Sequence, residues 1–423
     1  MISIVIPVKD ALDVTRRCVA ELFRHTKTPI ELILVDNGSR ADFAEFASGL
    51  ARARPEVRVI TNARNEGFAF AVNQGLAAAR GEHVVVMNND VLVTDGWLER
   101  MLAVFGADPR VGVVGPTSNR ASGPQEIPVA YDVENPGEDL AAFAREHART
   151  HAGQVQFLSR IVGLCVLVKR AVIDAIGGFD TRFWPGNFED DDFSLRALRA
   201  GFRLAVARDV FVHHHGSKTF ADLGIDYARV MHDNWRHFCA KWEHVGALGP
   251  YPARALATRR PFDAERDFVP LDARETFRPD ATPLPLDGTH ATRFLVIADV
   301  VDRGWLNRVA EFVREFRASD PVSLVVRIEP PTREVIELTT SLLREAIART
   351  GVPDADLPDV LIDASTIAAR RRGGLYTSAD ALLDTGEKTL RAPLWRREAT
   401  ACGIEVLAPG RLRERAELTP SAR

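Results

Sequence analysis

Residues 2–6 read Ile-Ser-Ile-Val-Ile, end at Pro7, and form the first of four short apolar runs that set the fold. The other three are Ile30–Val35, Val57–Ile60 and His83–Met87, and helical stretches separate them. Runs that are apolar on both faces and alternate with helices predict a parallel sheet covered on both sides. Ligands of such sheets bind at the carboxyl ends of the strands. The residues that follow each run are therefore the first candidates for a site.

The alternation of strands and helices resumes further along the chain. After an irregular stretch at 116–155, we expect a strand at Ile161–Val168, a helix from about Ala171 and another over Asp191–Ala200. The pattern then stops in a proline-rich segment and starts again with three more apolar runs. Those runs are Phe294–Ala298, Val322–Ile328 and Val360–Ile362. We therefore expect two α/β units, 1–245 and 289–412, a linker at 246–288 and a tail at 413–423.

The composition is that of an ordinary globular protein. The chain has 423 residues, of which 46% are hydrophobic and 26% charged, and its formal net charge is −4. This is enough apolar material for a sizeable core, and it argues against a largely disordered chain. A nearly balanced charge gives no reason to expect a nucleic-acid binder.

Cysteine usage and hydropathy give an expectation for the compartment. The four cysteines are far apart without Cys-x-x-Cys spacing, which argues against a disulfide framework or a zinc site. The apolar run in the middle of the chain is far shorter than the roughly 20 residues of a bilayer helix. The N-terminus lacks the basic region of a signal peptide. We expect a cytoplasmic protein, with peripheral association at the inner face of the membrane left open.

Short polar side chains follow two of the predicted strands. Val35 precedes Asp36-Asn37-Gly38-Ser39, whose carboxylate can accept hydrogen bonds from a base or ribose. Taken alone, this stretch is more often a turn that caps a helix. Met87 precedes Asn88-Asn89-Asp90, which can hold a hard divalent cation at the rim of the sheet. The alternative there is an N-cap for the helix near Trp97.

Four consecutive acids form the stretch Glu189-Asp190-Asp191-Asp192. Adjacent carboxylates repel one another unless a cation or hydrogen bonds compensate. A solvated helix start is the alternative, because acids favour a helix N-terminus. The surrounding residues are apolar: Phe183, Trp184, Phe188, Phe193 and Leu195. Such neighbours do not suit a fully solvated face, so we favour a functional role for the acids.

Three histidines, His213-His214-His215, follow the apolar run Val210–Val212. Imidazole near a carboxylate site is a suitable ligand for a metal or a phosphate. Adjacent residues of a strand point to alternate faces, so at most two of the three can share one site. A single histidine would most often be structural, but three at a strand end favour a function.

In order and spacing, these stretches resemble the family 2 glycosyltransferases, which have a glycosyltransferase A fold. The resemblance covers about residues 1–240. The matching stretches are Ile4-Val5-Ile6-Pro7-Val8, Val35-Asp36-Asn37-Gly38-Ser39, Asn65-Glu66-Gly67-Phe68-Ala69 with Asn73, Met87-Asn88-Asn89-Asp90, Gly177-Gly178-Phe179-Asp180, Glu189-Asp190-Asp191-Asp192 with Arg196, and His214-His215-Gly216-Ser217. The resemblance implies a Rossmann-like N-terminal unit with a mostly parallel sheet that binds a nucleotide-diphosphate sugar.

The resemblance also implies roles for individual residues at the donor. Asp36 would contact the base or ribose of the donor, and further donor-binding positions would be Pro7, Asn65, Asn73 and Asn89. Asp90 would be the last Asp of the family's Asp-x-Asp motif and would bind Mg²⁺ or Mn²⁺ on the donor diphosphate. Asn88 stands where the first Asp of that motif is found, so the metal site has one carboxylate fewer. His214 would reach the metal or the diphosphate, with His213 or His215 as substitutes.

On the acceptor side, the resemblance makes Asp190 the general base, with Glu189 beside it. The chemistry suits these residue types, because an attacking hydroxyl must lose its proton to a positioned carboxylate. A divalent cation can neutralise the charge on the departing diphosphate. One base without a covalent sugar–enzyme step predicts inversion at the anomeric carbon. The implied function is a hexosyltransferase of polysaccharide biosynthesis, with a glycan, a lipid-linked glycan or a protein as acceptor.

The second block weakly resembles the nucleotide-binding half of a two-Rossmann glycosyltransferase. The likeness rests on Phe294-Leu295-Val296-Ile297, Ser378-Ala379-Asp380-Ala381-Leu382-Leu383 and the stretch from Glu398 to Leu407. The acidic pair and glycine-rich loop of active members are incomplete, although Glu398 is present. We expect a smaller, Rossmann-like α/β domain that is degenerate and serves acceptor binding or assembly. A second active site is the alternative.

Two other functions compete with sugar transfer. A nucleotidyltransferase can have a similar sheet and similar metal carboxylates. It would be expected to carry a glycine-rich, basic phosphate loop after the first strand, and Pro7-Val8-Lys9-Asp10 offers none. A binding module that keeps the fold without turnover is the second alternative, and the intact acids Glu189–Asp192 argue against it.

Overall fold

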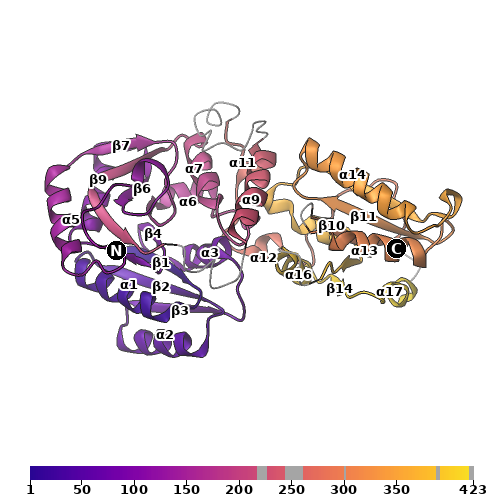
Figure 1. Ribbon diagram of the computed structural model, residues 1–423, viewed down its shortest axis with the longest axis horizontal. Helices are drawn as coiled ribbons and strands as arrows, with labels where there is room; N and C mark the ends of the chain where they lie inside the picture. Colours follow the sequence, from indigo (N-terminus) through magenta and orange to yellow (C-terminus); the bar gives the residue numbers. More distant parts are fainter. Residues whose placement is uncertain (217–225, 243–260, 300–301, 387–390, 419–423) are drawn as a thin grey trace. The chain divides into compact units, whose positions relative to one another are not determined.

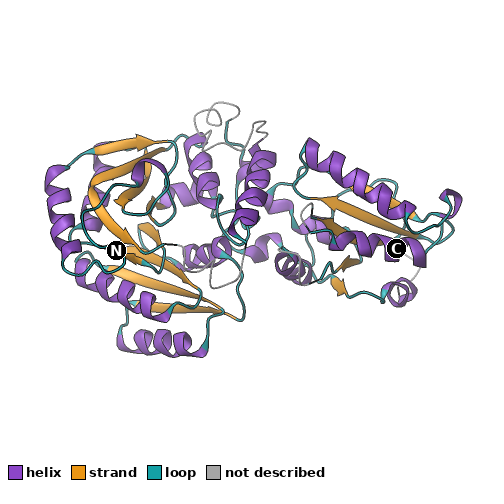
Figure 2. Cartoon of the chain, viewed as in Figure 1, coloured by secondary structure: helices purple, strands orange, loops and turns teal. Residues whose placement is uncertain are grey.

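The computed structural model describes residues 1–216, 226–242, 261–299, 302–386 and 391–418 (Figures 1 and 2). Ser217, much of the proline-rich segment and the last five residues lie outside this range. The described chain divides into two compact units. The first holds the residues up to Trp235 together with 261–272, and the second holds 236–242 and the residues from Ala273 onward.

The first unit is built on a nine-stranded sheet with the order β3-β2-β1-β4-β8-β6-β9-β5, and β7 pairs with β9. Six strands, β1 to β4, β6 and β9, share one direction, while β5, β7 and β8 run the opposite way. The bounds are β1 Ile2–Val8, β2 Ile30–Asn37, β3 Val57–Asn62, β4 His83–Met87, β5 Val91–Leu92, β6 Val111–Ser118, β7 Val155–Leu158, β8 Cys165–Lys169 and β9 Arg203–His214. The predicted α/β class with a mostly parallel sheet is confirmed.

Two hydrophobic cores explain why the central strands are apolar on both faces. In β1, Ile4 and Ile6 belong to one core, while Val5 between them belongs to the other. The first core is completed by helices α1, α2 and α4, and the second by α3, α6 and α7. The helix bounds are α1 Leu12–His25, α2 Ala41–Ala53, α3 Phe68–Ala78, α4 Trp97–Ala107, η1 Gly123–Gln125, α5 Asp139–Thr150, α6 Arg170–Ile176, α7 Glu189–Arg199, α9 Tyr227–Trp242 and α11 Ala264–Asp267. Helices therefore cover both faces of the sheet, as predicted.

The strand predicted at Ile161–Val168 begins only at Cys165. Side chains, rather than a neighbouring strand, take the backbone N–H groups of the residues before it. The Ile161 amide donates to Ser194 Oγ at 3.1 Å, and the Gly163 amide donates to Asp190 Oδ2 at 2.9 Å. The first part of the predicted strand is therefore a loop. The strand begins at the residue where backbone partners replace these side-chain acceptors. A second difference is β6, which continues to Ser118 and so occupies the start of the stretch expected to be irregular.

The described part of the predicted linker 246–288 is packed against the folded units. Val269 pairs with Gly177 in an isolated bridge, and the Gly178 amide donates to the Val269 carbonyl at 2.8 Å. Further along, the Leu284 amide donates to the Gly374 carbonyl at 3.0 Å. Residues 261–272 belong to the first unit and residues 273–288 to the second. The described proline-rich residues therefore do not form a free linker. Their backbone groups make hydrogen bonds to the unit to which each part belongs.

The second unit has a five-stranded, wholly parallel sheet with the order β12-β11-β10-β13-β14. Its bounds are α12 Ala273–Thr276, β10 Thr292–Ala298, α13 Gly304–Glu315, β11 Val322–Ile328, α14 Arg333–Ala348, η2 Asp354–Asp356, β12 Asp359–Asp363, η3 Ala369–Arg371, α15 Gly373–Thr377, β13 Ala381–Leu383, α16 Ala392–Ala401, β14 Glu405–Leu407 and α17 Leu412–Leu418. The expected smaller, Rossmann-like α/β unit is therefore present.

The expected tail is partly helical, because α17 extends to Leu418. Leu412 is fully buried in the core of the second unit, and Ala416 packs against the same core. The apolar contacts of this last turn keep the chain folded beyond the predicted boundary at 412. Among the described residues, the helices are all too short or too polar to cross a bilayer.

Candidate active site

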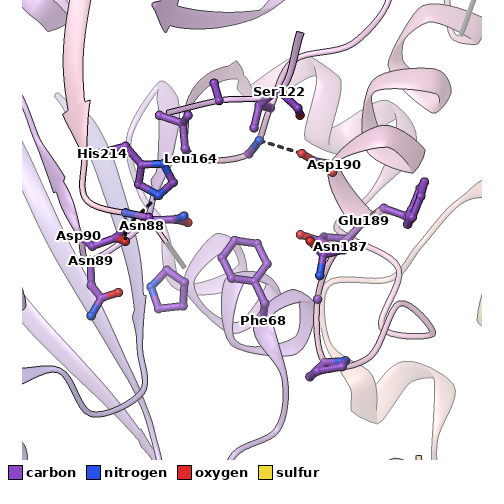
Figure 3. A pocket seen from close by; sticks show the side chains of 18 of the residues that line it. Phe68, Asn88, Asn89, Asp90, Ser122, Leu164, Asn187, Glu189, Asp190 and His214 are labelled. Carbon is purple, nitrogen blue, oxygen red and sulfur yellow. Dashed lines mark hydrogen bonds and ion pairs between the residues drawn. The ribbon is translucent and has the colours of Figure 1, made fainter. Parts of the chain in front are cut away.

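A cavity of about 470 Å³ opens at the carboxyl ends of the central strands of the first unit. Pro7 at the end of β1, Asn37 at the end of β2 and Asn88 after β4 contribute to its lining. Figure 3 shows Asp90 and His214 on one side of this cavity and Glu189, Asp190 and Asn187 on the other. Ligand binding at this edge is what the strand topology predicts.

Asp90 and His214 form an ion pair on one wall of the cavity. Their Oδ1 and Nε2 atoms are 3.2 Å apart, and the Gly216 amide donates to Asp90 Oδ2 at 3.0 Å. Burial acts to raise the pKa of Asp90, but His214 and the Gly216 amide outweigh it and hold that pKa below its ordinary value. Burial acts to lower the pKa of His214, but Asp90 raises it above its ordinary value. Each member of the pair therefore favours the charged form of the other.

The same two side chains suit a divalent cation. His214 Nδ1 lies 2.9 Å from the Arg120 carbonyl, so this nitrogen carries a proton and Nε2 is the one that faces Asp90. Asp90 Oδ1 is buried, and its contact in the described chain is the ion pair with His214 Nε2. Among the described residues, no group of three or more His, Cys, Asp or Glu side chains is arranged to hold a metal. Two protein ligands fit an ion that takes its other ligands from a diphosphate and water.

The three histidines separate as alternation along a strand requires. His214 lines the cavity, whereas His213 and His215 lie together on the opposite face with their ring centroids 4.5 Å apart. Tyr131 Oη lies 2.9 Å from His213 Nδ1, and burial together with His215 lowers the pKa of His213 to about 3. A neutral, buried imidazole bonded to Tyr131 is a packing residue. His214 is therefore the member of the triplet placed beside Asp90.

Hydrogen bonds between side-chain amides fix the part of the cavity wall at the ends of β2 and β3. Asn37 Nδ2 donates to Asn65 Oδ1 at 2.9 Å, and Asn62 Nδ2 donates to Asn37 Oδ1 at 3.0 Å. Asn37 and Asn65 both line the cavity, and so do two other predicted donor residues, Pro7 and Asn89. Asn89 Nδ2 donates to Thr15 Oγ1 at 2.9 Å, which fixes its orientation.

Two predicted donor residues do not line this cavity. Asp36 is 1% exposed, and its Oδ1 accepts the Ser39 amide at 2.8 Å. Asn73 uses both ends of its amide on the backbone of Phe179, with Nδ2 to the carbonyl and Oδ1 to the amide, each at 2.7 Å. Asn73 therefore ties α3 to the turn that follows α6. Asp36 Oδ1 and both ends of the Asn73 amide therefore bind the protein backbone instead of facing this cavity.

Asp190 has the fixed geometry expected of a general base. Its Oδ2 accepts the Gly163 amide and its Oδ1 accepts the Asp191 amide, each at 2.9 Å. Each carboxylate oxygen keeps a second lone pair for a proton. Asp192, by contrast, is fully buried and bonded to Arg196, with Nε to Oδ2 at 2.8 Å. The four acids thus divide into three that line the cavity and one that belongs to the core.

Burial raises the pKa values of two of the acids that face the cavity. Desolvation and the neighbouring charge of Asp190 raise the pKa of Glu189 well above its ordinary value. The same two causes raise the pKa of Asp191 to about 8. Carboxyl groups with raised pKa values in a cleft are typical of sites that handle protons. The compensating cation is Arg160, whose Nε lies 2.7 Å from Asp191 Oδ1.

Three residues of this site were missed by the sequence reasoning. Arg160 directly precedes the run Ile161–Val168 that was predicted to be a strand, and its Nη1 also donates to Ser122 Oγ at 2.9 Å. Lys9 lines the cavity with its Nζ 3.0 Å from the Gly38 carbonyl. Asn187 lines the opposite wall. Only Arg160 had a signal, as a basic residue that could balance the nearby acids, because the other two depend on how loops meet.

Comparison with known proteins places this geometry in a family. Residues 3–174 match the family described as glycosyl transferase family 2. The uncharacterized glycosyltransferase EpsJ of Bacillus subtilis is 32% identical over 255 residues, covering 59% of this chain and 72% of EpsJ. The chain belongs to glycosyl transferase family 2. The resemblance carried by the sequence motifs is thereby confirmed.

The comparisons also find more distant likenesses. This family 2 chain is 28% identical over 227 residues to the N-acetylglucosaminyl-diphospho-decaprenol L-rhamnosyltransferase of Mycobacterium tuberculosis, covering 47% of this chain and 71% of that enzyme. A solved structure of a mannosyltransferase from Pyrobaculum calidifontis, in complex with GDP-Man and Mn²⁺, is a remote likeness at 18% identity and a TM-score of 0.39, covering 60% of this chain and 77% of that one. Two other relatives are much longer, and the chain spans 24% and 20% of their lengths.

Proposed function

We propose that the first unit is an inverting glycosyltransferase that moves a sugar from a nucleotide-diphosphate sugar to an acceptor hydroxyl. One observation carries this proposal. The Asp90–His214 pair and the Glu189–Asp190 pair face the same cavity from opposite sides (Figure 3). A donor diphosphate on one side and a proton acceptor on the other is the arrangement that a single displacement needs.

The residues of each wall take separate parts in the reaction. Asp90 and His214 would hold a divalent cation, Mg²⁺ or Mn²⁺, which when bound stabilises negative charge on the donor diphosphate. Lys9, Asn37 and Asn65 lie at the strand ends where the nucleotide would bind. Asp190 accepts the proton of the acceptor hydroxyl as its oxygen bonds to the anomeric carbon. The bond from that carbon to the diphosphate breaks in the same step, so the configuration inverts.

The acceptor class is also a proposal. The M. tuberculosis relative is named for transfer of L-rhamnose to N-acetylglucosaminyl-diphospho-decaprenol. That name supports a sugar hydroxyl of a glycan or lipid-linked glycan as the acceptor, in polysaccharide biosynthesis. The second unit, whose parallel sheet lacks the complete acidic pair of active relatives, would serve acceptor binding or assembly.

The test is a donor and acceptor screen of the full-length protein. UDP-, GDP- and dTDP-sugars are supplied with Mn²⁺ or Mg²⁺ and a panel of octyl glycosides, and the released nucleoside diphosphate is measured. Asp190→Asn should lower transfer by about 10²- to 10⁴-fold, because the hydroxyl loses its base. Donor affinity measured by calorimetry should stay within about twofold.

Other results would contradict the proposal. Wild-type transfer rates in Asp190→Asn would remove the base from the mechanism. Release of pyrophosphate from a nucleoside triphosphate and a sugar phosphate would identify a nucleotidyltransferase. Tight donor binding without turnover in the whole screen would identify a binding module. Retention of anomeric configuration in the product, read by NMR, would exclude the single displacement.

A further inference from the structure

Two buried polar atoms on the acidic wall of the cavity lack partners. Neither Asn187 Nδ2 nor Glu189 Oε2 makes a hydrogen bond to any described part of the chain. Glu189 is only 7% exposed, and both residues line the cavity. A buried donor or acceptor without a partner costs about 1–3 kcal/mol, so such atoms at a cavity surface point to a ligand that completes them.

The loop that carries these atoms is held in an uncommon conformation. Asn187 and Phe188 have φ values of 78° and 71°, in the left-handed region that residues other than glycine rarely adopt. Asn234 of α9 stabilises the loop, because its Nδ2 donates to the Gly186 carbonyl at 2.8 Å and to the Asn187 carbonyl at 3.1 Å. Phe188 packs against Trp235 with ring centroids 5.7 Å apart. Backbone strain maintained by surrounding contacts is characteristic of functional sites.

The amide of Asn187 is oriented by its other end. Tyr227 Oη lies 3.5 Å from Asn187 Oδ1, which leaves the Nδ2 group as the one without a partner. A donor on Asn187 and an acceptor on Glu189, two residues apart on one wall, match the polarity of two neighbouring hydroxyls on a sugar ring. One hydroxyl donates to the carboxylate and the other accepts from the amide.

We propose that Asn187 and Glu189 together bind a pair of adjacent sugar hydroxyls, which makes Asn187 a specificity-determining residue. The inference rests on the proposed function, because it places a sugar in this cavity. The diol can belong to the transferred sugar of the donor or to the acceptor sugar, since both meet at the acidic wall. The experiment separates these two sources.

Asn187→Gly is the decisive variant. Glycine keeps the positive φ without strain, so the amide is removed while the loop conformation is retained. Asn187→Asp keeps the shape and replaces the donor by an acceptor, which makes it a second, independent variant. Asn135→Asp is the matched control, because Asn135 is exposed and does not line the cavity. Far-ultraviolet circular dichroism and thermal unfolding establish that each variant is folded.

The donor arm measures affinities by calorimetry. For the nucleotide base found in the screen, the nucleotide sugar is compared with the nucleoside diphosphate alone. If the diol belongs to the donor, Asn187→Gly should lose about 10- to 100-fold in affinity for the nucleotide sugar. Its affinity for the nucleoside diphosphate should not change. The control should match wild type for both ligands.

The acceptor arm measures kcat/KM with an active octyl glycoside and with its monodeoxy analogues. If the diol belongs to the acceptor, removing the recognised hydroxyl should cost the wild-type protein about 10- to 100-fold. Removing the same hydroxyl should leave the kcat/KM of Asn187→Gly almost unchanged, because this variant already lacks the amide that binds the hydroxyl. A loss of discrimination confined to one analogue is a result that general damage to the fold would not give.

The outcomes are separable from those of the proposed function. If wild type transfers sugar and both Asn187 variants keep its full deoxy penalties and its full sugar affinity, the diol site is wrong and the glycosyltransferase proposal stands. If wild type binds no nucleotide sugar, the proposed function itself fails, and the diol site fails with it.

Discussion

The two units carry charged residues at the carboxyl ends of their parallel strands, but the two sets of charges do different things. In the first unit, Asp90, His214 and Glu189 face a cavity, and some of their polar atoms have no partner in the described chain. In the second unit, Glu329 follows β11 and Asp363 ends β12, and both meet buried arginines. Similar placement in similar sheets thus gives the lining of a cavity in one unit and an internal ion network in the other.

The network of the second unit centres on Arg372. Its Nη1 donates to Glu329 Oε1 at 2.9 Å, and its Nη2 donates to Glu398 Oε2 at 2.7 Å. Tyr376 Oη donates to the same Glu398 oxygen at 2.6 Å. Burial opposes the charge of Arg372, but Glu329 and Glu398 raise its pKa well above the ordinary value. Glu398, the residue that carried the likeness to a nucleotide-binding half, is fully buried and serves packing.

The difference teaches that a position at the surface of a cavity, not residue type or place on the sheet, separates a candidate ligand site from structural charge. The buried network pairs its charges with one another inside the core, whereas a ligand site presents its charges at a cavity surface. Single atoms without a hydrogen bond occur in both sets, as at Glu398 Oε1 and Glu189 Oε2. Substitutions in each set should therefore have different consequences.

The largest expected effect is on stability in the second unit. Arg372→Met leaves Glu398 buried without its cation and removes one of the cations beside Glu329, which also pairs with Arg327. This should lower the free energy of unfolding by about 3–5 kcal/mol. Urea denaturation followed by circular dichroism measures this change. Arg333→Met is the matched control, because the Arg333 side chain is 92% exposed and its ion-pair partner in the described chain is the exposed Glu337. It should change stability by about 0.5 kcal/mol or less.

If Arg372→Met left the free energy of unfolding unchanged, the comparison would fail. The buried charges of the second unit would then not stabilise its fold. A second test replaces both Asp90 and Asp190 in the full-length protein. Tight binding of a nucleotide sugar by this variant would also contradict the comparison. It would show that a second donor site exists outside the cavity of the first unit.

The next effect is on metal-dependent donor binding in the first unit. Asp90→Asn removes one of two expected metal ligands and should weaken donor affinity by about 10- to 100-fold in the presence of Mn²⁺. With EDTA, variant and wild type should bind the donor equally, because neither then has the metal. Calorimetry with and without metal measures both affinities. Equal affinities in Mn²⁺ would remove Asp90 from the metal site.

The smallest effect is a shift of the pH–rate profile. Arg160 lies 2.7 Å from Asp191 and 3.8 Å from Asp190, and its charge favours the ionised carboxylates. Burial and Asp190 already raise the pKa of Asp191 to about 8, so losing the cation raises the proton affinity of this wall further. Under the proposed function, this acidic wall must be ionised to take a proton from the acceptor. The rising limb of kcat against pH should therefore move upward by about one unit in Arg160→Met.

Arg160→Lys is the control for that shift, because it keeps the charge and should restore most of the wild-type profile. A uniform loss of rate in Arg160→Met at all pH values, without a shift, would show that the arginine only supports the loop at Ser122.

Much of the fold could be predicted because its central strands are buried on both faces. Such strands leave an apolar run in the sequence, as at Ile30–Val35 and Val322–Ile328, and both are strands in the structure. The strand Val111–Ser118 was not predicted, because its glycines and Pro116 interrupt the apolar run and are typical of loops. The expected strand at 161–164 is a loop because side chains take its amides.

The site was predictable where a motif puts a polar residue directly at a strand end, as with Asp90 and His214. Periodicity gave the rule that the three histidines divide between two faces, but not which face the cavity lies on. Asn73 has the residue type of a ligand contact and is used by the Phe179 backbone, a partner 106 residues away. Asn187 and Lys9 enter the cavity through the meeting of loops, which a single sequence does not encode in any local pattern.

The bridge between Gly177 and Val269 has a practical consequence for dividing the molecule. A side chain at Gly177 would place its first carbon 1.8 Å from the Val269 carbonyl oxygen, so the two backbones are in direct contact. The Val269 amide also donates to the Ile176 carbonyl at 3.2 Å. A shortened protein that stops at 245 would leave these backbone groups exposed beside the helix α6. Expression of the first unit alone should therefore carry the chain through Asp272.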